Sequence, residues 1–336
     1  MKGDYFSREP PDKGRYGMFL IDDRVKQEAL NFATLMNILK ITEHKLDPIF
    51  ERFSQRVDVA VPMTDKDVIM EYSVFFDIPD LERMKRIYAF SRGKFLQLKP
   101  DDEIIKRGSL EYPPLLNATK QAPWFLYARG RIELLQEWRT VSLIGSRKAS
   151  DESKLNTERV AQTLGRNSIT VVSGLAKGID VTAHKSALER NYNTIAVIGT
   201  NLNQYYPPEN KEIQLEIEKR GLVVSQFSPA TKTERWFFPL RNGVMSGLSL
   251  ATVIMEAGEN SGALKQADFA IKQGRQVLIP VKALEISTLT WPKKYVEKGA
   301  QTVATPKEIL QKLADNNILN KDIGKEEQLD VNSIEK

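Results

Sequence analysis

The sequence of 336 residues contains no cysteine and only two histidines, His44 and His184. Without cysteine, no disulfide bond can form. Zinc sites are built largely from cysteine and histidine side chains, so two histidines do not supply a usual ligand set. We therefore expect neither disulfides nor a metal site.

Long apolar segments are also missing. No run approaches the ~20 apolar residues that a membrane-spanning helix requires. The first residues, MKGDYFSREPPDKGRYG, lack the apolar centre of a signal peptide. These features predict a cytoplasmic protein that has no contact with a membrane.

Charge of one sign is only slightly in excess, with 49 Lys and Arg against 44 Asp and Glu, a net charge of +5. A basic balance favours anionic partners such as nucleic acid, although many soluble proteins are mildly basic. The hydrophobic fraction of 41% and the charged fraction of 28% are typical of a globular protein. The length suggests two domains.

Two hydrophobic patterns divide the chain. Between about residues 24 and 95, apolar residues recur at helical spacing, as in RVKQEALNFATLMNILK, and indicate a small all-helical module. From residue 140, continuous apolar strands alternate with amphipathic helices, which is typical of a parallel sheet covered on both faces. Because crossovers between parallel strands are right-handed, we predict an α/β fold. It is a Rossmann-like, doubly wound, mostly parallel sheet with an N-terminal all-helical module.

The expected organisation has five parts. Polar segments flank the structured region at both ends, and short apolar runs with prolines join its two halves. The parts are a flexible arm (1–20), the helical module (21–98) and an extension that packs on the core (99–139). The Rossmann-like domain (140–314) and a disordered tail (315–336) follow.

Small, polar and basic residues concentrate at the carboxyl ends of the predicted strands. In an open parallel sheet, ligands bind in the crevice outside this edge. The five segments concerned are GSRKAS, SGLAKGID, GTNLNQYYPPEN, RWFFPLRN and EAGENSGALK. A single glycine after a strand often only closes a turn, but five such loops with basic side chains favour a ligand crevice.

The segment SGLAKGID predicts a close approach of the backbone to a ligand. Gly174 and Gly178 permit a tight turn without Cβ obstruction, and Lys177 between them adds a positive charge. The helix that follows, with Asp180 as its expected N-cap, directs N-terminal amides at the crevice. Such a helix end binds anions.

Further candidate ligands lie at the other strand ends. Gly145 and Ser146 end the first strand, and the planar guanidinium of Arg147 suits phosphate. Ser261 and Gly262 open a later helix. The remaining candidates are Lys148, Arg241 and Asn242. Together these residues favour phosphate as the ligand.

Two common nucleotide-binding motifs are missing. No G-x-G-x-x-G follows the first predicted strand, and no acidic residue is placed to bind a ribose. No G-x-x-x-x-G-K-[ST] is present either, which argues against hydrolysis of ATP by a Walker-type site.

From about residue 105 to 282, the chain resembles the DNA processing protein A family (DprA, also called Smf). The motifs that carry the resemblance are YPPLL, VSLIGSRKAS, VVSGLAKGIDVTAH, AVIGTNLNQYYPPEN, FPLRN, SGLS and MEAGENSGAL. The resemblance implies a homodimer that binds single-stranded DNA through the Rossmann-like domain and loads a RecA-type recombinase. It implies no catalytic reaction and no cofactor. Arg147 and Lys177 match family DNA contacts, with Gly145 and Ser146 shaping the anion pocket.

The chain departs from the family pattern at several positions. Gly243 stands where a basic residue is common, and Val281 follows Pro280 where glycine is common. SGALKQA replaces a more usual run of leucine, isoleucine, threonine and alanine, and the charged tail is too short for a winged helix. The chain is thus expected to be a divergent member, and DNA uptake, a mobile element or defence remain open as its process.

Two other functions stay open. The same pocket could hold a small signalling nucleotide in a nucleotide-sensing module. A nucleotide phosphoribohydrolase could use Glu256 at the end of the fifth strand, although the motif P-G-G-x-G-T-x-x-E is absent. We expect His184 to hold its loop by a local hydrogen bond rather than to act as a base with Asp180.

Aromatic residues accompany two of the strand ends. In ERWFFPLRN, the aromatic rings suit base stacking and the arginines suit phosphate, but Phe237 and Phe238 could equally close the core or a subunit interface. We expect Tyr205 and Tyr206 to be turn and packing residues, since a helix follows directly.

Overall fold

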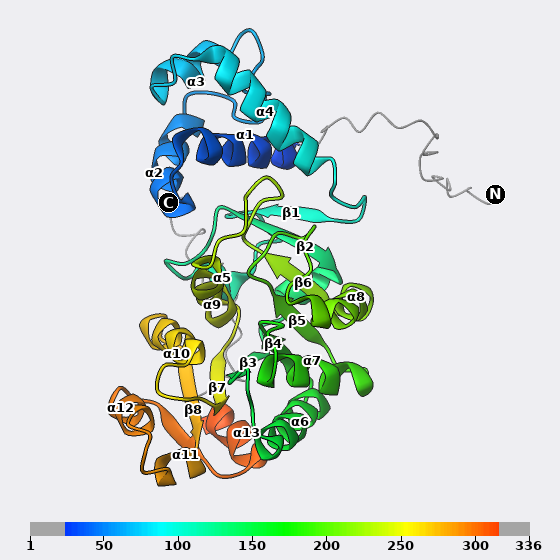
Figure 1. Ribbon diagram of the computed structural model, residues 1–336, viewed down its shortest axis with the longest axis vertical. Helices are drawn as coiled ribbons and strands as arrows, with labels where there is room; N and C mark the ends of the chain where they lie inside the picture. The colour runs from blue at the N-terminus through cyan, green and yellow to red at the C-terminus, as the bar shows by residue number, and fades with distance from the viewer. Residues whose placement is uncertain (1–23, 316–336) are drawn as a thin grey trace, which may run out of the picture.

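The computed structural model describes residues 24–315. The predicted arm over 1–20 lies outside these residues, as does the predicted tail apart from Asp315. The described part is elongated, with the N-terminal helices at one end and the last strands at the other (Figure 1).

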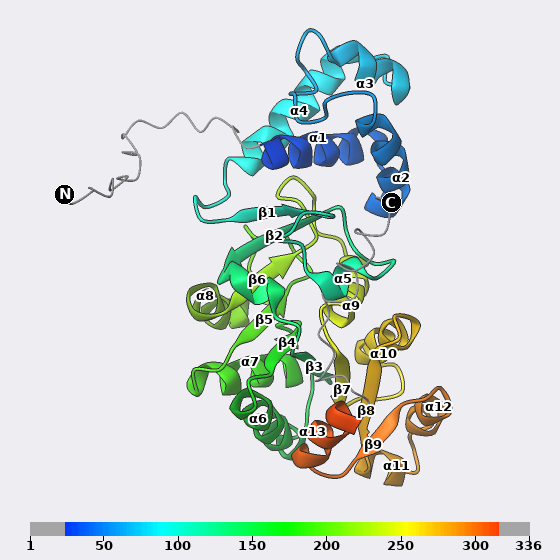
Figure 2. The same ribbon diagram turned by 180° about the vertical axis from the view of Figure 1, so that it is seen from behind.

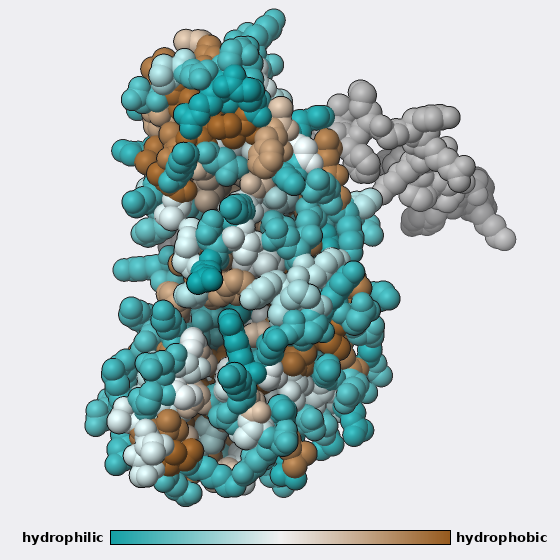
Figure 3. Space-filling model, in the orientation of Figure 1, coloured by the Kyte–Doolittle hydropathy of each residue, from teal (hydrophilic) through white to brown (hydrophobic). Residues whose placement is uncertain are grey.

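The N-terminal helices pack beside the edge of the sheet. They are α1 (Arg24–Leu39), α2 (Glu43–Ser54), α3 (Ile69–Phe75) and α4 (Leu81–Phe95). The helix α1 is buried along most of its length because it packs against both α4 and β1 (Figure 2). At the start of α4, the side chain of Asp80 accepts a hydrogen bond from the main-chain nitrogen of Arg83 and caps the helix. In Figure 3, hydrophobic residues gather at this end of the molecule, over the N-terminal helices.

The sheet of the described chain has nine strands in the order β1-β2-β6-β5-β4-β3-β7-β8-β9. They are β1 (Glu103–Lys106), β2 (Phe125–Gly130), β3 (Thr140–Gly145), β4 (Thr170–Ser173), β5 (Thr194–Val197), β6 (Leu222–Ser225), β7 (Ala251–Glu256), β8 (Gln276–Pro280) and β9 (Gln301–Val303). The strands from β3 to β9 pair in parallel, whereas β1 and β2 add an antiparallel margin beside β6.

Helices cover both faces of the sheet. One face packs against α6 (Asp151–Arg166), α7 (Ile179–Glu189) and α13 (Pro306–Asp315), with α8 (Lys211–Arg220) beside α7. The other face packs against α5 (Pro114–Asn117), α9 (Phe237–Gly247), α10 (Gly262–Lys272) and α12 (Trp291–Glu297), with α11 (Lys282–Glu285) near the end of β8. The predicted fold class, a Rossmann-like, doubly wound, mostly parallel sheet with N-terminal helices, is therefore confirmed.

The helix α9 differs from the sequence expectation. The segment FFPLRNGVMSG contains a proline and two glycines, a composition that favours a loop. Pro239 lies in the first turn of α9, where a missing N–H costs no hydrogen bond within the helix. The helix thus begins at Phe237 and carries Arg241 and Asn242 toward the sheet edge.

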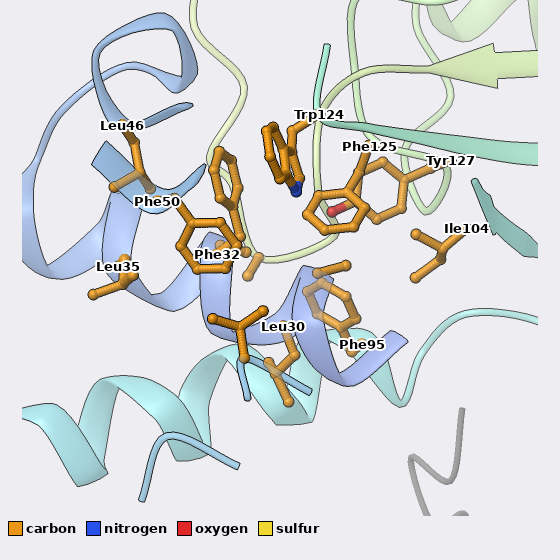
Figure 4. Packing of buried hydrophobic residues seen from close by; sticks show 14 of the residues in the cluster. Leu30, Phe32, Leu35, Leu46, Phe50, Phe95, Ile104, Trp124, Phe125 and Tyr127 are labelled. Carbon is orange, nitrogen blue, oxygen red and sulfur yellow. The ribbon is translucent and has the colours of Figure 1, made fainter. Parts of the chain in front are cut away.

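One hydrophobic cluster joins the N-terminal helices to the sheet (Figure 4). Phe50 of α2 meets Trp124 edge to face, with ring centroids 6.0 Å apart, and Phe32 of α1 meets Phe125 at 5.7 Å. Arg107 lies 4.5 Å from the centre of the Trp124 ring and forms an ion pair with Asp47 of α2 at 2.7 Å. Helical module and sheet therefore share one core at Trp124.

The strand order reverses between β3 and β7. From β3 the chain continues to β4 on one side, while β7 lies on the other side and continues to β8. The loops that leave β3 and β7 therefore diverge, and a crevice opens at the carboxyl ends of these two strands.

Candidate functional site

A cleft of about 870 Å³ lies where the sequence predicts the ligand crevice. The loops after β3 and β7, the helix α9 and the first turns of α10 line it. Eight of the predicted site residues line this cleft: Gly145, Ser146, Arg147, Lys148, Arg241, Asn242, Ser261 and Gly262. The structure thus brings together residues that are more than 100 positions apart in the sequence.

Positive charge dominates the lining of the cleft. Its cationic side chains are Arg147, Lys148, Arg235, Arg241 and Lys265. All of these except Arg241 are exposed, and none of the ion pairs found within residues 24–315 involves them. Among the described residues that line the cleft, the one carboxylate, Asp180, is buried. An anionic ligand in the cleft therefore meets accessible positive charges.

The N-terminus of α10 adds to the positive potential. Ser261 caps this helix by accepting a hydrogen bond from the main-chain nitrogen of Ala263 at 3.3 Å. The first turn of α10 holds no acidic residue, and the side chain of Asn242 donates to the main-chain oxygen of Gly262. Because the positive end of this helix dipole is not balanced by a carboxylate in its own first turn, it is suited to bind phosphate.

The helix α6, unlike α10, carries acidic side chains at its N-terminus. Its first turn contains Asp151 and Glu152. The carboxylate of Glu256 also accepts hydrogen bonds from the main-chain nitrogen of Ser150 at 3.0 Å and from its hydroxyl at 2.6 Å. These bonds, formed with Ser150 at the N-cap of α6, help to hold the pKa of Glu256 below its usual range although burial opposes them. Glu256 therefore serves as a cap.

Arg241 forms the buried floor of the cleft. Its Nη1 donates to the main-chain oxygen of Gly174 at 2.5 Å and to that of Val197. Burial lowers the pKa of Arg241 to about 10, so the guanidinium remains charged at neutral pH. Burial raises the pKa of the neighbouring Asp180, which accepts a hydrogen bond from the main-chain nitrogen of Ala176.

Of the loop SGLAKGID, Ala176 and Asp180 line the cleft and the two glycines support it. Gly174, Lys177 and Gly178 do not appear among the described residues that line the cleft. A Cβ on Gly174 would lie 2.2 Å from Nη1 of Arg241, and one on Gly178 would lie 2.2 Å from the main-chain oxygen of Ser146. The close approaches of these two glycines are therefore made to protein atoms.

Lys177 is directed along the surface toward the next loop. Its side chain forms an ion pair with Glu209 in the short helix η2 (Pro208–Asn210). Asn210 donates to the main-chain oxygen of Leu175 at 2.9 Å and joins the same two loops. The expectation that Asp180 caps α7 is wrong: Gly178, with φ of +73°, is the N-cap, and Asp180 occupies the second position of the helix.

An aromatic pair borders the cleft. The rings of Tyr206 and Phe238 have centroids 5.1 Å apart, and both side chains line the cleft. Tyr206 is 48% exposed, which leaves much of its ring accessible to a ligand. Phe237 instead lies in the core, stacked on Phe227 at 3.9 Å. The prediction for Tyr206 as a packing residue is thus incomplete, because its ring also lines the cleft.

Sequence reasoning did not include several lining residues in the site. They are Tyr206, Asn260, Lys265 and Gln266. Arg235 also lines the cleft, as an arginine of ERWFFPLRN that suits phosphate. For Lys265 a signal existed, since it follows Ser261 by four residues and the two lie on one face of a helix. For Gln266 no comparable signal existed, because its position depends on how α10 packs against α9.

His184 lies in the core and away from the cleft. Its Nδ1 lies 2.7 Å from the hydroxyl oxygen of Thr194 on β5. Burial, reinforced by the charge of Arg241, lowers the pKa of His184 to about 3 and keeps the ring neutral. The expected local hydrogen bond is thus present, but it connects α7 to the sheet. Neither His184 nor Glu256 lines the cleft.

Residues 24–315 contain neither a cluster of metal ligands nor a membrane-spanning helix. No group of three or more histidine or acidic side chains in this range is placed to hold a metal ion. No helix in the same range is long and apolar enough to cross a membrane.

Comparison with known proteins gives one family. The model of the family described as DNA recombination-mediator protein A matches residues 103–314. The DNA processing protein DprA of Streptococcus pneumoniae is 36% identical over 200 residues, which cover 59% of this chain and 70% of that protein. Protein Smf of Synechocystis is 34% identical over 219 residues, and these cover 64% of this chain but only about half, 53%, of that protein.

Solved structures agree with the sequence matches. The crystal structure of DprA from S. pneumoniae has a TM-score of 0.65 and 26% identity, covering 86% of this chain and 95% of that one. The DprA structure from Helicobacter pylori has a TM-score of 0.57 and 26% identity, covering 64% of this chain and 96% of that one. With a family model matched over more than half of its length, this chain belongs to the DNA recombination-mediator protein A (DprA/Smf) family.

Proposed function

We propose that this chain binds single-stranded DNA in the cleft between the carboxyl ends of β3 and β7. The observation that carries this proposal is the group of four exposed cations around the cleft, which form none of the ion pairs found in residues 24–315. The N-terminus of α10 lies beside them. The H. pylori relative supports the proposal, because its structure is described as showing a single-stranded DNA binding mode.

In this proposal, phosphates and bases contact different parts of the cleft. Phosphates meet the side chains of Arg147, Lys148 and Lys265 and the first amides of α10. Bases stack on the ring of Tyr206, beside Phe238. Base stacking on an aromatic side chain contributes ~1–3 kcal/mol per base. A flexible single strand can enter such a cleft and place its bases there, whereas a duplex is too stiff to do so.

The predicted contacts in the loop SGLAKGID act through the protein in this proposal. Gly174 leaves room for Arg241, and Gly178 leaves room for the main chain of Ser146. Lys177 contributes to binding because its ion pair with Glu209 holds η2 against the loop. It also adds a positive charge near the bound DNA strand. We assign the direct phosphate contacts to the residues that line the cleft.

We further propose that the chain acts as a recombination mediator without a catalytic reaction. By family resemblance it forms a homodimer in the cytoplasm and loads a RecA-type recombinase onto the bound strand. The residues 140–314 then form the DNA-binding domain, with 99–139 as an extension and 21–98 as the helical module. Glu256 and His184, the two candidates for catalysis, are engaged by Ser150 and Thr194.

One titration series tests this function. Purified protein is titrated against a single-stranded oligonucleotide, the corresponding duplex and free nucleotides, each at several salt concentrations. We expect the single strand to bind most tightly, with log K falling by roughly 0.7 per neutralised phosphate for each unit of log salt. Equal affinity for strand and duplex would overturn the proposal. If the protein released free base from a nucleoside monophosphate and Glu256→Ala abolished this release, a phosphoribohydrolase function would replace the proposed one.

A further inference from the structure

The outer face of α4 carries an exposed aromatic ring. In Figures 1 and 2, α1 lies between α4 and β1, so one side of α4 packs on α1 and the other side faces solvent. Phe90 lies on the solvent side and is 55% exposed. The buried residues of the helix lie on the opposite side: Met84, Tyr88, Ser91 and Phe95. Packing of the core therefore does not account for the position of the Phe90 ring.

Positive charge surrounds this ring. Residues 83–100 contain no acidic residue and six basic ones: Arg83, Lys85, Arg86, Arg92, Lys94 and Lys99. Because residues four apart lie on one side of a helix, Arg86 and Lys94 flank Phe90. The Nζ atom of Lys94 lies 5.8 Å from the centre of the Phe90 ring. The outer face of α4 thus places one aromatic ring between two cations.

These cations are available to a ligand. Arg92 and Lys94 form none of the ion pairs found within residues 24–315. Arg86 lies 4.0 Å from Asp80 and its side chain is 69% exposed, and such an exposed pair contributes little. Basic residues in the last turn of α4 also suit the helix dipole. The dipole explains neither Arg86 in the middle of the helix nor the exposed ring.

The ring also borders open space. Gly93 follows Phe90 by three residues and therefore lies on the same side of the helix. No atom of residues 24–315 lies within 4 Å of a Cβ built on Gly93. A planar group therefore has room beside Phe90.

We propose that this outer face, defined by Arg86, Phe90, Gly93 and Lys94, is a second binding surface for single-stranded DNA. Bases stack on Phe90, and phosphates pair with Arg86 and Lys94. A helix that docks on a protein presents apolar anchors three or four residues apart, whereas here cations take the positions four residues before and after Phe90. A duplex keeps its bases paired and does not offer them to a side chain.

The inference rests on the proposed function for its ligand, but not for its location. A long strand occupies the cleft and the outer face of α4 together, and this raises its affinity without any new contact in the cleft. A short strand fills the cleft alone. The contribution of α4 should therefore depend on the length of the strand.

The test compares a short oligonucleotide with long poly(dT). Phe90→Ala should weaken binding of the long strand roughly 5–100-fold, the range for one stacked base, and should leave binding of the short strand unchanged. Val74→Ala is the matched control, because Val74 is 75% exposed on α3 and lies outside the basic segment. This control should bind both strands like the parent.

Two substitutions at Gly93 test the role of charge without removing a side chain. Gly93→Glu adds a carboxylate beside the cations and should weaken binding of the long strand. Gly93→Gln, which has the same size and no charge, should weaken it far less. Neither variant should lower the melting temperature, because the space is open and glycine is a poor helix former.

The outcomes distinguish failure of this inference from failure of the proposed function. If the double variant Arg147→Ala, Lys148→Ala binds both strands like the parent, the function proposed for the cleft is wrong. If Phe90→Ala binds the long strand as tightly as the parent, or if the two Gly93 variants bind it alike, only the second surface is wrong. If Phe90→Ala instead loses binding to phosphatidylglycerol vesicles alone, the face contacts a lipid surface and the inference is overturned.

Discussion

The Nη1 atom of Arg241 donates to the main-chain oxygen of Gly174 at a distance of 2.5 Å. This bond joins α9 to the end of β4, and a second bond to Val197 joins α9 to β5. Because Gly174 has no Cβ, the guanidinium can lie directly against the main chain. The floor of the cleft therefore depends on a glycine that does not itself line the cleft.

Gly174→Ala should destabilise the fold. The added Cβ would lie 2.2 Å from Nη1 and 2.5 Å from Cζ of Arg241, so the buried side chain would have to shift. Overpacking of this kind costs about 1–3 kcal/mol in the free energy of unfolding, measured by urea denaturation. Gly258→Ala is the matched control, because no atom of residues 24–315 lies within 4 Å of its added Cβ. Equal stability of the two variants would contradict the arrangement.

The cations at the cleft and in the supporting loop should contribute unequally to binding. Arg147 is exposed and forms none of the ion pairs found in residues 24–315, whereas Lys177 is paired with Glu209. We expect Arg147→Ala to weaken binding of single-stranded DNA more than Lys177→Ala, and to lower the salt dependence by about one phosphate. Fluorescence anisotropy at several salt concentrations measures both. If Lys177→Ala weakened binding more than Arg147→Ala, the main phosphate contact would lie in the loop SGLAKGID instead.

Stability should fall at acidic pH because His184 is buried as a neutral ring. Its pKa is about 3 in the folded chain, against an ordinary value of 6.5 for an exposed histidine, so the unfolded chain binds the proton first. The contribution is complete above pH 6.5 and is lost as the pH falls toward 3. At pH 5 the loss is about 2 kcal/mol.

Variants at the two histidines isolate this contribution from that of the carboxylates. His184→Gln should show a shallower decrease in unfolding free energy between pH 7 and pH 5 than the parent chain. His44→Gln serves as the control, because His44 is exposed. If the parent and His184→Gln have the same pH dependence, the assignment of a neutral, buried ring is wrong.

Trp124 should couple the N-terminal helices to the sheet. Its ring packs on Phe50 and under Arg107, its Nε1 donates to Glu28, and its main-chain nitrogen donates to Glu43. Truncation of a buried tryptophan to alanine costs about 3–5 kcal/mol. We expect Trp124→Ala to lose this amount, and Trp236→Ala to lose much less, because Trp236 is 45% exposed. Calorimetry of both variants checks the prediction.

The sequence predicted the fold well because its signals are local. Continuous apolar strands such as TVSLIG alternate with amphipathic helices, and this alternation requires a parallel sheet with two covered faces. The position of the cleft followed from the same pattern, since the carboxyl ends of parallel strands meet at one edge. Eight of the predicted residues line the cleft for that reason.

Side-chain directions could not be predicted in the same way. The sequence shows Lys177 between two glycines, but its pairing with Glu209 depends on how the loops after β4 and β5 lie together. The position of Gln266 in the cleft likewise results from the packing of α10 on α9. Both features arise from contacts between segments that are distant in the sequence, which local patterns do not record.

The most direct test of the central claim is the affinity of the double variant Arg147→Ala, Lys148→Ala for a single-stranded oligonucleotide. Both side chains are exposed at the rim of the cleft, so the variant should keep the melting temperature of the parent. Lys219→Ala on α8 is the control for loss of a surface charge away from the cleft. We predict a lower affinity for every sequence and a salt slope reduced by about two phosphates, with the control unchanged. A folded double variant that binds the strand as tightly as the parent, with the same salt slope, would contradict the assignment of this cleft to DNA.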